Sequence, residues 1–193
     1  MNLPNRISLL RIILVPFMAA AYLINYEYAP LIAVGIFIIA AATDFLDGYI
    51  ARKRQLVTDL GKILDPIADK LLVVFALFLV VEARVMPFGM GAICGGIIIG
   101  RELIVNVIRQ VAASKNVIIH ANIYGKIKTI FQDISLPMLM LLKMKATLIE
   151  FSQSFFNVFR ITSFIIFGIA VVLTLMSGIV YVIQNRSVFG ESK

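Results

Sequence analysis

Residues 31–52 have the sequence LIAVGIFIIAAATDFLDGYIAR, in which an apolar run ends in two aspartates and an arginine. Residues 31–42 are apolar enough to enter a lipid bilayer, which a helix crosses with about 20 mostly apolar residues. Asp44 and Asp47 stand close to the point where this run meets polar sequence. Ionisable groups at membrane depth are costly and usually functional. The stretch therefore predicts a transmembrane helix with a site near its end.

The whole chain has the composition of a membrane protein. Of its 193 residues, 61% are hydrophobic and only 15% are charged, whereas soluble domains average about a quarter charged. The mean hydropathy is +0.97. We expect an all-α integral membrane protein that forms one domain over residues 1–193.

Apolar stretches of spanning length recur along the chain. The six predicted transmembrane helices cover residues 7–25, 31–52, 60–82, 87–113, 123–145 and 156–184. Residues 1–8, which include Arg6, are predicted to form an N-terminal interfacial segment. With the N-terminus inside, the outer loops hold only Arg84, Lys143 and Lys145, so the positive-inside rule places both termini in the cytoplasm. This bias explains the net charge of +7 without a nucleic-acid partner.

The chain has few residues that bind soft metals. Cys94 is the only cysteine and His120 the only histidine. An internal disulfide is therefore excluded, and so is a Cys/His cluster for zinc or iron. Any bound metal must be held by oxygen ligands.

The first two aspartates share one helix face. Asp44, Asp47, Gly48 and Ala51 follow the i, i+3, i+4, i+7 pattern. Asp44 precedes Arg52 by about 12 Å along the helix axis, at about 1.5 Å per residue. This pair is therefore expected just below the membrane surface.

A second acidic pair follows in the next predicted helix. Asp65 and Asp69 have i, i+4 spacing, and a short polar connection over residues 53–59 joins the two helices. Both pairs therefore enter the membrane from the same face. We expect four carboxylates to converge just below the cytoplasmic surface.

Such a cluster requires compensating positive charge. Hard oxygen ligands suit magnesium, manganese or calcium, and four carboxylates can bridge two metals about 3.5–4 Å apart, as in enzymes that act at phosphorus. The alternative is that single aspartates form ion pairs with Arg52, Lys62 or Lys70. Two same-face pairs with small residues between them favour the metal site.

The spacing resembles a family signature. That signature is D-x2-D-G-x2-A-R-x8-G-x3-D-x3-D, of the CDP-alcohol phosphatidyltransferase family. Its fixed positions are matched by Asp44, Asp47, Gly48, Ala51, Arg52, Gly61, Asp65 and Asp69. The segments 2–11, 100–109 and 125–129 resemble the bacterial phosphatidylglycerophosphate synthase branch of the family, whereas residues after about 133 match only in being hydrophobic.

The resemblance implies a site and a reaction. It implies a bacterial plasma-membrane enzyme of phospholipid biosynthesis with six transmembrane helices and a polar cavity open to the cytoplasm. Two divalent cations, magnesium or manganese, are bound by Asp44, Asp47, Asp65 and Asp69. An alcohol attacks the lipid-bearing phosphorus of CDP-diacylglycerol and CMP leaves. Asp69 is the implied general base for the alcohol proton.

The resemblance also implies a binding site for the CDP-lipid. Gly48, Ala51 and Gly61 are the small positions that leave room for the cytidine nucleotide, with Arg52 nearby. Asn5 is expected to reach the diphosphate.

The acceptor is predicted from basic residues at membrane depth. An acceptor that carries phosphate needs several cations, and arginine can bind its oxygens in pairs. The predicted acceptor-phosphate residues are Arg101, Arg109, Lys126 and Lys128. Glycerol 3-phosphate fits this set. The alternative is that Arg101 pairs with Glu102 or Asp133 and that the lysines only set the topology.

Other hypotheses stay open from the sequence. A sister enzyme with another acceptor, such as a cardiolipin or phosphatidylserine synthase, shares the signature. An ion-coupled transporter also binds cations at intramembrane aspartates, although such sites tend toward the midplane of repeated halves. The pairs Gly91/Gly95 and Gly96/Gly100 have the small-xxx-small spacing of close helix packing, within one bundle or in a homodimer.

Overall fold

The computed structural model describes residues 3–54, 59–115, 123–144 and 153–186, and it describes their side chains except at residues 3–4, 44–54, 59–60, 62–63, 65 and 88. Within these ranges all regular structure is helical. The α-helices are α1 (Leu3–Leu23), α2 (Ala29–Arg54), α3 (Asp59–Glu82), α4 (Met90–Ser114), α5 (Ile123–Leu141) and α6 (Gln153–Gln184). A short 3-10 helix, η1 (Pro87–Gly89), precedes α4.

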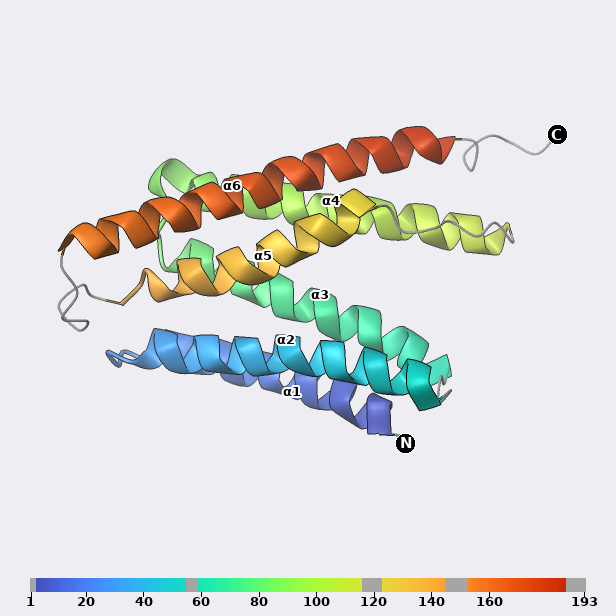
Figure 1. Ribbon diagram of the computed structural model, residues 1–193, viewed down its shortest axis with the longest axis horizontal. Helices are drawn as coiled ribbons and strands as arrows, with labels where there is room; N and C mark the ends of the chain where they lie inside the picture. Colours follow the sequence, from blue (N-terminus) through green and yellow to red (C-terminus); the bar gives the residue numbers. More distant parts are fainter. Residues whose placement is uncertain (1–2, 55–58, 116–122, 145–152, 187–193) are drawn as a thin grey trace.

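Successive helices run in alternating directions along one bundle (Figure 1). The start of α1 and the end of α6 lie at the same end of the bundle, on the right in Figure 1. The end of α2 and the start of α3 also lie at this end of the bundle. The prediction that both chain ends share one side agrees with this arrangement.

The helices agree with the predicted spans to within a few residues, with two differences in detail. α4 begins at Met90 instead of residue 87, because Gly89 takes a left-handed backbone conformation with φ of 69° and breaks the helix. α5 ends at Leu141, four residues before the predicted end.

Three described helical segments are long and apolar enough to cross a membrane, namely Asn5–Leu23, Met90–Ser114 and Gln153–Gln184. The apolar part of α2, Ala29–Thr43, is shorter. By length and composition, these helices indicate a helical membrane protein.

The N-terminal interfacial segment is not a separate element in the structure. α1 runs without interruption from Leu3 to Leu23. Asn5, Ser8 and Arg11 are buried, so this part of the chain packs within the bundle. The prediction considered only the charge of Arg6, which is itself exposed, and not the inward face one turn further on.

The bundle has an apolar core and an apolar outer surface. α1 packs against α2 and α3, while α6 packs against α4 and α5. Val15, Phe37 and Leu77 are among the buried core residues that join these helices. Large apolar side chains also point outward, such as Phe17 at 63% exposure and Ile93 at 64%. Apolar side chains on both sides of a helix are typical of a bundle whose surroundings are lipid.

A polar contact joins α1 and α5 at the end of the bundle opposite the chain termini. The Tyr22 hydroxyl donates a hydrogen bond to the Met140 carbonyl at 3.1 Å. The Lys143 ammonium donates to the Tyr22 carbonyl at 2.6 Å and lies 4.4 Å from the centre of the Tyr22 ring. These contacts hold the end of α1 against the end of α5.

Candidate active site

Asp69 is the signature aspartate whose side chain the structure describes. It lies on α3, is exposed, and borders two adjoining cavities. The structure does not describe the side chains of the signature residues Asp44, Asp47, Gly48, Ala51, Arg52 and Asp65. Their backbones belong to α2 and α3, which pack together.

A polar cavity of about 250 Å³ opens beside Asp69. It is lined by the first half of α3, the second half of α4, the start of α5 and Tyr181 near the end of α6. Its basic lining includes all four predicted acceptor-phosphate residues, Arg101, Arg109, Lys126 and Lys128, together with Lys70. Residues from three helices thus surround one space with positive charge.

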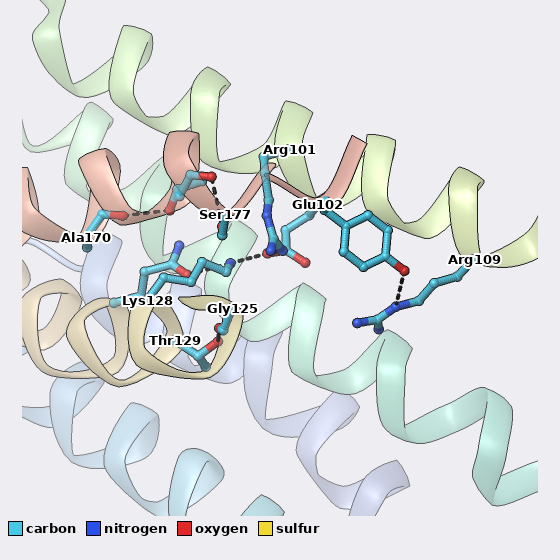
Figure 2. A network of polar contacts seen from close by, with 11 residues as sticks. Arg101, Glu102, Arg109, Gly125, Lys128, Thr129, Ala170 and Ser177 are labelled. Carbon is cyan, nitrogen blue, oxygen red and sulfur yellow. Dashed lines mark hydrogen bonds and ion pairs between the residues drawn. The ribbon is translucent and has the colours of Figure 1, made fainter. Parts of the chain in front are cut away.

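Glu102 holds two of these cations. Its Oε1 accepts a hydrogen bond from Arg101 Nη1 at 3.2 Å and another from Lys128 Nζ (Figure 2). Lys128 also donates to Gln132 Oε1 at 2.9 Å. The alternative that Arg101 pairs with Glu102 is therefore observed. The pair nevertheless faces the cavity, so the contact positions the cations there.

Arg101 reaches the cavity through a narrow passage between two glycines. A Cβ atom at Gly178 of α6 would lie 3.0 Å from Arg101 Cγ, and one at Gly125 of α5 would lie 3.3 Å from Arg101 Nη2. A side chain at Gly178 would therefore press on the rigid base of Arg101. A side chain at Gly125 would meet only its flexible tip.

Arg109 is anchored by α6. Its Nε donates a hydrogen bond to the Tyr181 hydroxyl at 3.2 Å, and its guanidinium carbon lies 5.7 Å from the centre of the Tyr181 ring (Figure 2). This hydrogen bond uses Nε, while the two terminal nitrogens provide the paired donors that suit phosphate oxygens. Lys126 is exposed and borders the same cavity.

A second cavity, of about 190 Å³, shares five lining residues with the first, namely Asp69, Lys70, Glu102, Lys128 and Thr129. The rest of its lining is largely apolar and comes from α3 and α4, including Val73, Ile98 and Leu103. Gln132 of α5 also borders it. A polar space and an apolar space therefore meet at Asp69.

Two of the residues that were predicted to bind the CDP-lipid lie outside the lining of these cavities. Asn5 and Gly61 are both buried, on α1 and α3. Neither borders the two cavities at Asp69. Their assignment to the CDP-lipid stays a prediction.

Comparison with known proteins decides the family. The sequence model of the CDP-alcohol phosphatidyltransferases matches residues 1–183. The chain belongs to the CDP-alcohol phosphatidyltransferase family. A Bacillus subtilis (strain 168) protein named CDP-diacylglycerol–glycerol-3-phosphate 3-phosphatidyltransferase is 40% identical over 162 residues, which cover 78% of this chain and 82% of that protein. A Haemophilus influenzae protein of the same name is 36% identical over 182 residues, which cover 93% of this chain and 91% of that protein.

Among the side chains that the structure describes, no three of His, Cys, Asp and Glu are grouped closely enough to hold a metal. Of the family's four signature aspartates, only Asp69 belongs to this described set. Its hard carboxylate oxygens suit a divalent cation, and it faces the cavities. The described part of the site therefore fits a metal-dependent member of the CDP-alcohol phosphatidyltransferase family.

Several lining residues were missed from the sequence. Lys70 was considered only as an ion-pair partner, although it borders both cavities. Gln132 lies one turn beyond Lys128, and this i, i+4 spacing on α5 is a signal that could have found it. Tyr181 and Gly178 lie far along the chain from the other site residues, so no local pattern pointed to them.

Proposed function

We propose that this chain transfers the phosphatidyl group of CDP-diacylglycerol to glycerol 3-phosphate, forming phosphatidylglycerophosphate and CMP. Family membership and the names of its relatives support this reaction. The observation that carries the proposal is that Asp69 and the four predicted phosphate-binding cations line one cavity.

The cavity chemistry favours an acceptor that bears a phosphate. Charge-assisted hydrogen bonds to phosphate are stronger than neutral ones, and arginine makes them in pairs. Arg109 is held with its guanidinium at the cavity, and Arg101 and Lys128 are held there by Glu102. Serine has no phosphate group to accept hydrogen bonds from Arg109 and Lys126.

In the proposed reaction a hydroxyl oxygen of glycerol 3-phosphate attacks the lipid-bearing phosphorus of CDP-diacylglycerol. A new P–O bond forms, the P–O bond to CMP breaks, and CMP leaves with that electron pair. Asp69 accepts the proton of the attacking hydroxyl, a role that requires a carboxylate within hydrogen-bond reach of the acceptor. Its position at the border of the cation-lined cavity supports this role.

The family signature supports a site for two divalent cations, magnesium or manganese. Asp44, Asp47, Asp65 and Asp69 would hold them. When bound, such cations neutralise charge on the diphosphate during in-line transfer. On the donor side we assign Gly48, Ala51 and Gly61 to the nucleotide, with Arg52 nearby and Asn5 at the diphosphate.

The same proposal covers topology. All six α-helices cross the bacterial plasma membrane, and the polar cavity and both termini face the cytoplasm. The cavity is lined by the start of α5 and by Tyr181 near the end of α6. The start of α1, the end of α4 and the start of α5 carry Arg6, Arg109 and Lys126, as the positive-inside rule expects. Of the two glycine pairs on α4, Gly91 and Gly95 are buried within the bundle, so only the pair Gly96/Gly100 is available to a homodimer.

The test is CMP release by detergent-purified protein. CDP-diacylglycerol and magnesium are supplied, and glycerol 3-phosphate, serine, inositol phosphate or phosphatidylglycerol is offered separately. We expect release that depends on glycerol 3-phosphate and stops on chelation of magnesium. Release with another acceptor alone would identify a sister enzyme. No release from folded protein, together with cation-driven solute uptake in vesicles, would identify a transporter instead.

A further inference from the structure

Arg109 differs from the other cations of the polar cavity in the group that holds it. Arg101 and Lys128 share the carboxylate of Glu102. Arg109 is exposed on α4, and among the described residues its one hydrogen-bond partner is the Tyr181 hydroxyl, 3.2 Å from Nε. A long side chain loses rotamer freedom when it binds a ligand, so a contact that fixes it beforehand strengthens binding.

Tyr181 is a rigid anchor for this contact. Its side chain is only 2% exposed and packs with Val105 and Ile108 of α4 in a small core cluster. A tyrosine side chain has two χ angles, so packing of the ring also fixes the place of the hydroxyl. The guanidinium carbon of Arg109 lies 5.7 Å from the centre of the same ring. The hydroxyl and the ring face therefore hold Arg109 together.

The chemistry of this anchor suits an anionic ligand. A tyrosine hydroxyl accepts a hydrogen bond without the negative charge that a carboxylate brings. Among the described residues no carboxylate forms an ion pair with Arg109, so its positive charge stays available at the polar cavity. The contact uses only Nε, and the two terminal nitrogens can bind phosphate oxygens as a pair. A carboxylate in place of the hydroxyl would also order Arg109, but it would compete with the ligand.

We propose that Tyr181 is a positioning residue for the acceptor: its hydroxyl holds Arg109 so that the terminal nitrogens bind the phosphate of glycerol 3-phosphate as a pair. This inference rests on the proposed function, because it takes an acceptor that bears a phosphate. The family signature lies on α2 and α3, whereas Tyr181 lies on α6. Part of the selectivity for the acceptor is thereby assigned to a helix that the signature does not cover.

The test is the variant Tyr181→Phe, which keeps the ring and its packing but removes the hydroxyl. CMP release by purified protein is measured at varied glycerol 3-phosphate and saturating CDP-diacylglycerol. We expect the KM for glycerol 3-phosphate to rise about tenfold, the size of effect that one hydrogen bond to a charged group produces. The kcat and the KM for CDP-diacylglycerol should not change. An unchanged KM for glycerol 3-phosphate in the active variant would overturn the positioning role.

Two further variants show whether the hydroxyl acts through Arg109. In an Arg109→Met background, Tyr181→Phe should not raise the KM for glycerol 3-phosphate any further, and a second tenfold rise would overturn the inference. The matched control is Tyr22→Phe, which removes another buried tyrosine hydroxyl, bonded to the Met140 carbonyl. It should leave the KM unchanged. An equal rise in Tyr22→Phe would assign the effect to a general loss of packing and not to Arg109.

If Tyr181→Phe does not fold, Arg109→Lys tests the same contact from α4. Lysine keeps the charge but lacks both Nε–H and the paired donors, so the KM for glycerol 3-phosphate should rise as in Arg109→Met. A wild-type KM in Arg109→Lys would overturn the positioning role. Absence of CMP release with glycerol 3-phosphate from folded wild type would refute the proposed function. Release by the wild type with an unchanged KM in Tyr181→Phe would refute only the role of Tyr181.

Discussion

The substitution Gly178→Ala should weaken binding of the acceptor without touching it. The new Cβ would lie 3.0 Å from Arg101 Cγ, closer than side chains normally approach. Because Cγ is near the base of the side chain, relief of this contact requires Arg101 to rotate. The guanidinium would then move away from Glu102 and from the polar cavity.

The structure sets the size of the effect. Alanine improves helix propensity by about 0.5–1 kcal/mol over glycine, while crowding in a packed site costs about 1–3 kcal/mol, so the protein should lose roughly 1 kcal/mol of stability. A hydrogen bond to a charged group contributes about 1.5–3 kcal/mol. Its loss should raise the KM for glycerol 3-phosphate by about 10- to 150-fold, at about 1.4 kcal/mol per factor of ten.

The assay is CMP release at varied glycerol 3-phosphate and fixed CDP-diacylglycerol, together with thermal unfolding. Gly168→Ala is the matched control, because Gly168 is also on α6 and its added Cβ would meet nothing within 4 Å. In an Arg101→Ala background the crowded Cγ is gone, so Gly178→Ala should raise the melting temperature as Gly168→Ala does. An unchanged KM in Gly178→Ala, or equal destabilisation in both backgrounds, would refute the reasoning.

Three further predictions test other parts of the molecule. Asp69→Asn should abolish CMP release while binding of CDP-diacylglycerol stays measurable by thermal shift; substantial turnover would remove Asp69 from the base role. Lys126→Ala should raise the KM for glycerol 3-phosphate by about tenfold, the value of one charge-assisted contact, and an unchanged KM would count against its phosphate role. Tyr22→Phe should lower the free energy of unfolding by about 1 kcal/mol through loss of the bond to Met140, with unchanged KM values; unchanged stability would contradict that contribution.

The helical class and the order of the helices could be predicted because they depend on local hydropathy. The basic residues Arg101, Arg109, Lys126 and Lys128 were selected from their membrane depth and from the family resemblance, and the structure brings them to one cavity with Asp69. Their roles toward a substrate stay predictions.

Other features depend on how distant helices cross. Gly178 matters only because α6 passes α4 where Arg101 leaves its helix. The position of Gln132 in a cavity lining depends on how α3, α4 and α5 pack around that cavity. The interfacial segment was wrongly separated from the first span, since burial of Ser8 and Arg11 is decided by packing within the bundle and not by the charge of Arg6.

The contact of Glu102 with Arg101 and Lys128 has a consequence for selectivity among anions. The carboxylate is a resident competitor, since any incoming anion must draw both cations away from it or share them with it. A singly charged ion such as chloride offers these cations no more than Glu102 already supplies. A doubly charged phosphate monoester offers more, and it also brings oxygens in the geometry that guanidinium prefers. We therefore expect Glu102 to favour a phosphate monoester over monovalent anions at Arg101 and Lys128.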